Sequence, residues 1–174
     1  MKAKRPYPEI ENLLSPEKEG AKSVNYFRRE KGRFVISTDP GSLDPAAVYG
    51  FLSEAKWWGA DLTPESLHRA LGHSICFSLL EEGRQIGIAR IITDYVTYAY
   101  LCDVFIVQER RRQGLGTWLI RSVLEHPDLK SLKRVSLITH DAQSFYLGLD
   151  FHFAAHPDWY MERYLDKVYQ PFNL

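Results

Sequence analysis

The sequence predicts an α/β fold, with one mixed β-sheet that carries helices on both faces. The first observation is the order of the periodic segments: strand, two helices, three strands, helix, strand, helix and strand. The second is the size of the chain, because 174 residues, 45% of them hydrophobic, are typical of one domain with its own buried core. Such a core needs neither a metal nor a disulfide to stabilise it.

The first part of the domain is predicted to hold a strand and two helices. Residues 33–39 are apolar and β-branched and end in an Asp-Pro-Gly turn, which is typical of a strand. Asp44 followed by proline is an N-cap pattern, and apolar residues then recur at helical spacing over 45–58, before a glycine. A Thr-Pro-Glu sequence opens a shorter helix through residue 71.

The remaining elements follow the same rules of spacing. Glu82-Gly83 joins two apolar runs and so predicts a hairpin, and a third run of β-branched and aromatic residues follows. These three strands are expected over 74–80, 86–92 and 98–107. The last elements are expected as a helix over 117–126, a strand over 134–140, a short helix over 142–149 capped by Asp141, and a final strand over 151–156.

Residues 1–33 are predicted to be a loosely ordered extension that precedes the folded domain over 34–174. This segment has more Lys and Arg than Asp and Glu, several Pro and Gly residues, and few periodic apolar positions. The alternative is an arm that packs on its own domain, or on a second subunit in a homodimer. The apolar residues available for such a contact are Tyr7, Leu13, Leu14, Tyr26 and Phe27.

The overall composition argues against several classes of partner. The 22 Lys and Arg residues balance the 22 Asp and Glu residues, so we expect no bulk electrostatic binding to nucleic acid or to an anionic membrane. No apolar run approaches the length of a membrane span, and the N-terminus lacks the apolar core of a secretory signal. Cys76 and Cys102 belong to no Cys-x-x-Cys pair or Cys/His cluster. We therefore expect buried thiols, a cytoplasmic location and no metal site.

A basic loop with two glycines follows the strand over 98–107 and precedes a helix. Gly114 and Gly116 lack a Cβ, so a ligand can approach the backbone closely. The free amides of the first helical turn form an anion site, and Arg111 and Arg112 add charged donors for phosphate oxygens. The alternative is a plain turn beside a solvated basic run. The spacing fits neither a Walker A loop nor the Gly-x-Gly-x-x-Gly of dinucleotide binding.

Two motifs in this part of the chain resemble those of the Gcn5-related N-acetyltransferase (GNAT) superfamily. Arg-x-x-Gly-x-Gly over 111–116 is similar to its central motif, and FYLGLDF over 145–151 resembles its (L/F)Y-x-x-x-GF motif. The resemblance covers about residues 34–160 in the family order. It implies a single-domain, mostly antiparallel sheet that is splayed between the fourth and fifth strands, with acetyl-CoA bound in the opening.

The resemblance also implies which residues bind this co-substrate. Backbone groups of Val104, Phe105 and Ile106 are expected to pair with the pantetheine arm like an added strand. The pyrophosphate is expected over the amides of the loop and first helical turn, with Arg111 beside them. The residues of that cradle are Arg112, Gln113, Gly114, Leu115, Gly116 and Thr117.

Three positions depart from the family pattern. Asp150 replaces the glycine before the last phenylalanine of the second motif, although Asp can also adopt a left-handed conformation. Gln108 stands where a proline is usual after the strand, which affects loop rigidity only. Cys102 stands where polyamine acetyltransferases of the family carry a glutamate, so the sequence does not support a polyamine acceptor.

Tyr146 and Asp103 are the candidate catalytic residues. The resemblance places Tyr146 near the thioester sulfur, where its phenol is the candidate acid for the departing thiolate; the alternative is a packed helix aromatic. Asp103 is the sole carboxylate within its predicted strand and could bind an amine or relay its proton. A structural hydrogen bond to the neighbouring backbone is the alternative for Asp103. His140 and His152 are weaker candidates for a proton relay.

The acceptor is expected to be the primary amine of a small molecule, acetylated by direct attack in a ternary complex. Trp57, Tyr98 and Asp103 are the candidate acceptor-binding residues, and ordinary packing is the alternative for the two aromatic ones. Two other functions remain open: an acetyltransferase for peptide or protein amino groups, and a catalytically silent sensor that binds acyl-CoA.

Overall fold

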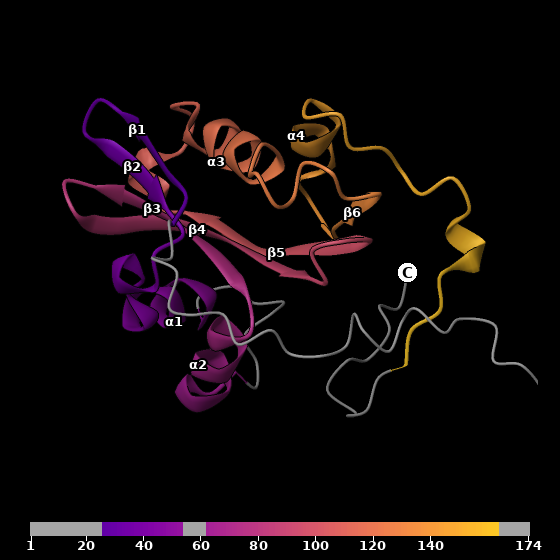
Figure 1. Ribbon diagram of the computed structural model, residues 1–174, viewed down its shortest axis with the longest axis horizontal. Helices are drawn as coiled ribbons and strands as arrows, with labels where there is room; N and C mark the ends of the chain where they lie inside the picture. The colour runs from indigo at the N-terminus through magenta and orange to yellow at the C-terminus, as the bar shows by residue number, and fades with distance from the viewer. Residues whose placement is uncertain (1–25, 54–61, 164–174) are drawn as a thin grey trace, which may run out of the picture.

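The computed structural model describes residues 26–53 and 62–163, which form one sheet with helices on both faces (Figure 1). The six strands lie side by side in chain order. The first five form an antiparallel sheet, and the sixth pairs parallel with the fifth. This confirms the predicted mixed, mostly antiparallel sheet. The strands are β1 (Arg28–Lys31), β2 (Phe34–Ser37), β3 (Ile75–Glu81), β4 (Arg84–Thr93), β5 (Tyr98–Ile106) and β6 (Arg134–Ser136).

The helices divide between the two faces of the sheet. One face carries α1 (Pro45–Ser53) and α2 (Pro64–Gly72), and the other carries α3 (Leu115–Leu124) and α4 (Gln143–Leu147). In the part of the chain that the structure describes, no helix is both long and apolar enough to cross a membrane. The chain order of these helices between the strands is the one that the sequence predicts.

Local sequence explains where the first two helices begin. The Asp44 carboxylate accepts hydrogen bonds from the amides of Ala46 and Ala47, as expected of an N-cap. Thr63 and Ser66 form a reciprocal capping box at the start of α2. The helix predicted over 45–58 is described only through Ser53, because residues 54–61 lie outside the described part.

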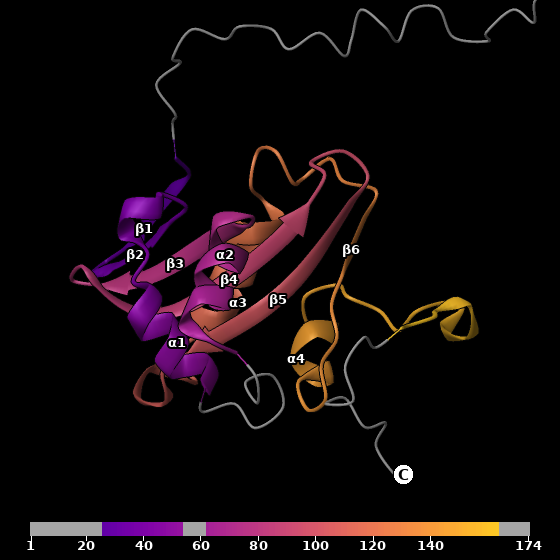
Figure 2. The same cartoon turned by 90° about the horizontal axis from the view of Figure 1, so that it is seen from below.

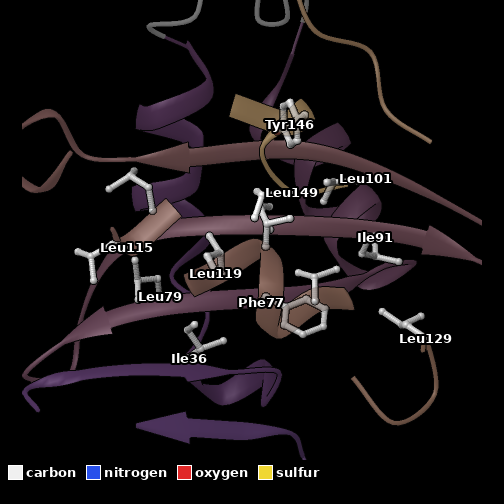
Figure 3. Close-up of a cluster of buried hydrophobic side chains, with 14 of the residues drawn as sticks. Ile36, Phe77, Leu79, Ile91, Leu101, Leu115, Leu119, Leu129, Tyr146 and Leu149 are labelled. Carbon is white, nitrogen blue, oxygen red and sulfur yellow. The ribbon is translucent and has the colours of Figure 1, made fainter. Parts of the chain in front are cut away.

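Each face of the sheet has its own apolar core. The larger core lies under α3 and α4, where Phe77 and Leu101 of the sheet meet Leu119 of α3 and Tyr146 of α4 (Figure 3). The smaller core joins Val48 and Leu52 of α1, Leu67 and Leu71 of α2, and Ile88 of β4. Each fully buried aliphatic side chain contributes about 1.5–3 kcal/mol, so these cores fix both helix layers on the sheet.

The predicted boundary at residue 33 is wrong, because β1 lies within the expected extension. Arg28–Lys31 pairs with Phe34–Ser37 as the first hairpin of the sheet. Phe27 packs against the rings of Phe77 and His126, with centroids 5.9 and 5.0 Å away. Residues 26–33 therefore follow the alternative interpretation, an arm that packs on its own domain. Residues 1–25, with Tyr7, Leu13 and Leu14, lie outside the described part.

The C-terminal part differs most from the expected elements. Asp141 is not the cap of α4: Ala142 is the N-cap residue, and its amide donates a hydrogen bond to the Thr139 hydroxyl. The strand predicted over 134–140 is described only as the three residues of β6. Residues 151–156 form no strand, and a short 3₁₀ turn over Pro157–Trp159 follows. Apolar alternation alone does not create a strand, because a strand also needs a neighbouring edge.

Candidate active site

The sheet opens between β5 and β6. The two strands pair only at Tyr98–Tyr100 with Arg134–Ser136, whereas β5 continues to Ile106. Beyond Tyr100, the edge of β5 that faces away from β4 therefore has no strand beside it among the described residues. An open edge offers backbone groups to an extended ligand that carries amides. The sequence predicts this splay, and the expected ligand-binding residues lie along it.

A β-bulge shapes β5 at the same place. Arg90 pairs with Cys102 and Ile88 pairs with Phe105, so Ala89 faces both Asp103 and Val104. Asp103 adopts a φ of 50°, in the left-handed region. Bulges of this kind bend a strand and interrupt its ladder of hydrogen bonds.

The strands also approach each other closely beside the bulge. A Cβ on Gly87 would lie 2.6 Å from the Phe105 carbonyl oxygen, so glycine is required at that position. Val104 packs against the larger core and Ile106 is buried, whereas Phe105 stacks on Phe51 with centroids 4.6 Å apart. The side chains of the open segment are thus held by both cores.

The loop after β5 leads directly to the start of α3. Gly114 is its N-cap residue, with a φ of 74°, and the first helical hydrogen bond runs from the Trp118 amide to the Gly114 carbonyl. The amides of Leu115, Gly116 and Thr117 therefore have no acceptor within the helix. With the positive end of the helix dipole, these amides form a site for an anion.

The three arginines of this loop have different partners. The Arg110 side chain donates to Glu81 on β3 at 2.8 Å, so it ties the loop to the sheet. Arg111 donates to the Ile106 carbonyl at 2.8 Å, and its guanidinium lies 5.4 Å from the centre of the Phe105 ring. The exposed Arg112 forms no hydrogen bond or ion pair with the described residues. Among these arginines, Arg112 thus has the guanidinium that is free to meet an anion.

The helix α4 places Tyr146 near this loop. The ring of Phe145 would lie 3.5 Å from a Cβ on Gly116, which is an ordinary van der Waals contact, so α4 lies beside the first turn of α3. Tyr146 is 8% exposed, and its ring contacts Phe145 and Phe151. Burial raises the pKa of Tyr146 to about 12, so its hydroxyl stays protonated at neutral pH.

The corner after α4 confirms the expectation for Asp150. The amides of Leu149 and Phe151 both donate to the Tyr146 carbonyl, and Asp150 adopts a φ of 63° between them. Asp thus occupies the left-handed position for which the family motif uses glycine.

Asp103 is held by an arginine that the sequence analysis did not single out. Its carboxylate accepts from the Arg90 Nε at 2.5 Å, and the two side chains are 16% and 13% exposed. Arg90 also donates to the Ser74 hydroxyl at 3.0 Å. Burial works to lower the pKa of Arg90, but the Asp103 carboxylate outweighs it and raises that pKa. A lone arginine inside the apolar run of residues 86–92 was the available signal for this pair.

The two cysteines lie beside this ion pair and are only half-buried. Burial raises the pKa of Cys76 to about 11 and that of Cys102 to about 12. Both side chains therefore stay as thiols at neutral pH, so neither is an activated nucleophile. Within the described residues, no group of three or more His, Cys, Asp or Glu side chains could hold a metal ion.

The remaining candidates are spread around the site. The Tyr98 hydroxyl shares a hydrogen bond with Ser136, so it joins β5 and β6 where the opening begins. Trp57 lies outside the described residues. His152 is exposed on the segment after α4, and His140 lies in the loop before that helix. The structure thus brings the loop of residues 111–117, the open edge of β5 and α4 together.

Comparison with known proteins agrees with this arrangement. Residues 45–151 match the model of the acetyltransferase (GNAT) family. FG08082 of Gibberella zeae, a protein assigned to the acetyltransferases, is 36% identical over 131 residues, which are 64% of this chain and 74% of that protein.

Solved structures of the family have the same fold. A crystal structure from Xanthomonas campestris pv. campestris, assigned to the GNAT family, is 38% identical, with a TM-score of 0.75 over 80% of this chain and 99% of that one. A GNAT acetyltransferase of Elizabethkingia anophelis, solved with acetyl-CoA bound, is 18% identical, with a TM-score of 0.50 over 68% of this chain and 73% of that one. With the family model matching most of the chain, the protein belongs to the GNAT family of acetyltransferases, which are acyltransferases that use acetyl-CoA.

Proposed function

We propose that the protein transfers the acetyl group of acetyl-CoA to the primary amine of a small molecule, by direct attack in a ternary complex. One observation carries this proposal: the open edge of β5 leads into the unpaired amides at the start of α3. This track suits a ligand with an amide-bearing arm at one end and a pyrophosphate at the other. The two features follow each other in the chain, so one extended ligand can reach both.

Each part of the track has a proposed role toward acetyl-CoA. The backbone of Val104–Ile106 pairs with the pantetheine arm, and the amides of residues 112–117 bind the pyrophosphate. Arg112 adds a charged donor, because its guanidinium has no partner among the described residues. Arg111 supports the end of β5 through its bond to the Ile106 carbonyl. The relative from Elizabethkingia anophelis, which holds acetyl-CoA on the same fold, supports this assignment.

The proposed reaction joins the acceptor nitrogen to the thioester carbon and breaks the carbon–sulfur bond. The amine gives up one proton, and the departing thiolate takes up one. Tyr146 is assigned to the sulfur, where its hydroxyl donates a hydrogen bond to the developing thiolate. Because its pKa is raised to about 12, the phenol is a weaker acid than a thiol near 8.5. Its main effect is therefore to stabilise negative charge on sulfur, and water can complete the protonation.

Asp103 is assigned a structural role in the site rather than that of a base that removes the proton of the amine. Its carboxylate is neutralised by Arg90, which favours the structural interpretation of this residue. The pair holds the left-handed residue of the bulge, from which the open segment of β5 begins. Tyr98 stands at the narrow end of the opening and is proposed, with Trp57, to contact the acceptor.

Two measurements test the proposal. Calorimetric titration with acetyl-CoA should show binding, and release of free thiol should then be measured with a panel of small amines and with amino-terminal peptides. Turnover with small amines is the expected result. Turnover with peptides alone would contradict the proposed acceptor, and binding without turnover on any acceptor would favour the silent sensor. A protein that gives no heat and no thermal shift with acetyl-CoA would contradict the proposed cofactor site.

A further inference from the structure

A pocket of about 260 Å³ lies near the start of β3, away from the proposed acetyl-CoA track. Besides α2 and β3, four parts of the chain line it: the arm at Tyr26 and Phe27, the segment after β2, the turn between β4 and β5, and the corner after α3. That turn and that corner lie at one end of the strands, whereas the loop before α3 lies at the other end (Figure 2). None of residues 104–117 lines the pocket, so the proposed acetyl-CoA site does not explain it.

The charges around this pocket suit a cation. Asp128 is the one acidic side chain among the described residues that line it, and none of these residues is a lysine or an arginine. The exposed Asp128 carboxylate forms no hydrogen bond or ion pair with the described part of the chain. An unpaired carboxylate attracts a positively charged group and repels an anion.

His126 lies beside Asp128 and is neutral at pH 7. Burial lowers the pKa of this imidazole, and the Asp128 carboxylate opposes the shift only in part. The Nδ1 atom accepts a hydrogen bond from the Asp128 amide at 3.2 Å, so the proton of the ring is on Nε2. His126 therefore brings no positive charge to the pocket, and the charge of Asp128 stays uncompensated.

Aromatic rings from Tyr26, Phe27 and Tyr95 also line the pocket. Tyr95 has a φ of 64°, a conformation that a bulky side chain rarely adopts. The turn holds it there, because the Tyr95 amide donates to the Thr93 hydroxyl at 2.9 Å and the next three amides donate to the Asp94 carboxylate. Backbone strain of this kind is found mostly at functional sites. The faces of such rings attract organic cations.

We propose that this pocket binds a small organic cation, with its charged nitrogen at Asp128 and its apolar body against the rings of Tyr26 and Tyr95. The volume is slightly below the usual range for drug-sized ligands, so a molecule with a single ring fits. Leu71 and Ile75 add apolar surface for that ring. The site is separate from the acetyl-CoA track, and the proposal does not depend on the proposed function.

Titration calorimetry with benzyltrimethylammonium tests the charge of the site. This probe has one ring and a fixed positive charge, and it has no N–H group that could be acetylated. The wild-type protein should bind it saturably, whereas phenylacetate, an anion with one ring, should not bind. Asp128→Asn keeps the size of the side chain and should weaken binding of the cation by about fivefold or more. The matched control is Asp158→Asn, at an exposed residue of the 3₁₀ turn, which should leave the affinity unchanged.

Tyr95→Gly separates binding from folding. Glycine adopts a φ of 64° without strain, so the melting temperature should not fall, although the affinity for the probe should fall several-fold because the ring is lost. Saturating acetyl-CoA should leave the affinity for the probe unchanged, because the two sites lie at opposite ends of the strands. No saturable binding of the cation up to about 10 mM would overturn the proposal. Equal affinities of the wild type, Asp128→Asn and Tyr95→Gly, or competition with acetyl-CoA, would also overturn it.

Discussion

Gly114 offers a direct test of the proposed pyrophosphate site, because two isosteric substitutions separate charge from shape. A Cβ at this residue would meet no atom within 4 Å, so a side chain fits without clash in the free protein. The φ of 74° is left-handed, where a side chain costs about 1–2 kcal/mol, and less for Asn and Asp. Gly114→Asn and Gly114→Asp should therefore fold equally well, with similar small losses of stability.

The two variants should differ in their affinity for acetyl-CoA. The Asp carboxylate would stand beside the amides that bind the pyrophosphate. If the carboxylate lies about 5 Å from a phosphate charge, in an effective dielectric constant of about 40, their repulsion costs about 1.7 kcal/mol of binding free energy for each phosphate charge. Two charges give about 3 kcal/mol, or roughly 150-fold weaker binding, whereas Gly114→Asn should lose only a few-fold.

Titration calorimetry at two salt concentrations measures this difference. The loss of affinity for acetyl-CoA in Gly114→Asp should be smaller at high salt, because salt screens charges that lie partly in solvent. Melting temperatures of the free variants serve as the control for folding. Equal affinities of the Asn and Asp variants for acetyl-CoA would refute the placement of the pyrophosphate at this helix start.

Other substitutions test the site and the packing. Tyr146→Phe keeps the ring and removes the hydroxyl that stabilises charge on sulfur, so kcat should fall by about 10²–10³ while the melting temperature stays close to that of the wild type; an unchanged kcat would remove Tyr146 from the mechanism. Arg90→Met leaves the Asp103 carboxylate unpaired in a site that solvent barely reaches, and should cost about 2 kcal/mol in urea unfolding, less than the roughly 3–5 kcal/mol of a fully buried pair. Adding Asp103→Asn, which removes the charge and tolerates the left-handed φ of residue 103, should recover part of that loss, and a double variant less stable than Arg90→Met would contradict the pairing. Phe27→Ala should cost about 2 kcal/mol because its ring packs on the core, whereas Tyr26→Ala, at a residue 45% exposed, should cost less than about 0.5 kcal/mol; equal losses would argue against a packed arm.

Local patterns along the chain were enough to predict most elements and the anion-binding loop. The caps at Asp44 and Thr63, and the hairpin turn at Glu82-Gly83, depend on neighbouring residues only, and the structure has them where the sequence places them. The glycine loop is also local, because its chemistry follows from a strand, a short turn and a helix start. Asp150 belongs to the same class, since its left-handed φ is a property of one turn.

Partners that lie far apart in the chain required the fold. Arg90 and Asp103 meet because β4 and β5 pair in one register, and the bulge that turns Asp103 toward Arg90 has no sequence signature of its own. Phe27 and β1 join the sheet only because β2 offers an edge and the larger core offers a surface. Residues 151–156 show the reverse case: their alternation is that of a strand, yet their own sheet gives them no neighbour. Periodicity depends on the residues of one segment, whereas pairing depends on which edges the rest of the chain leaves open.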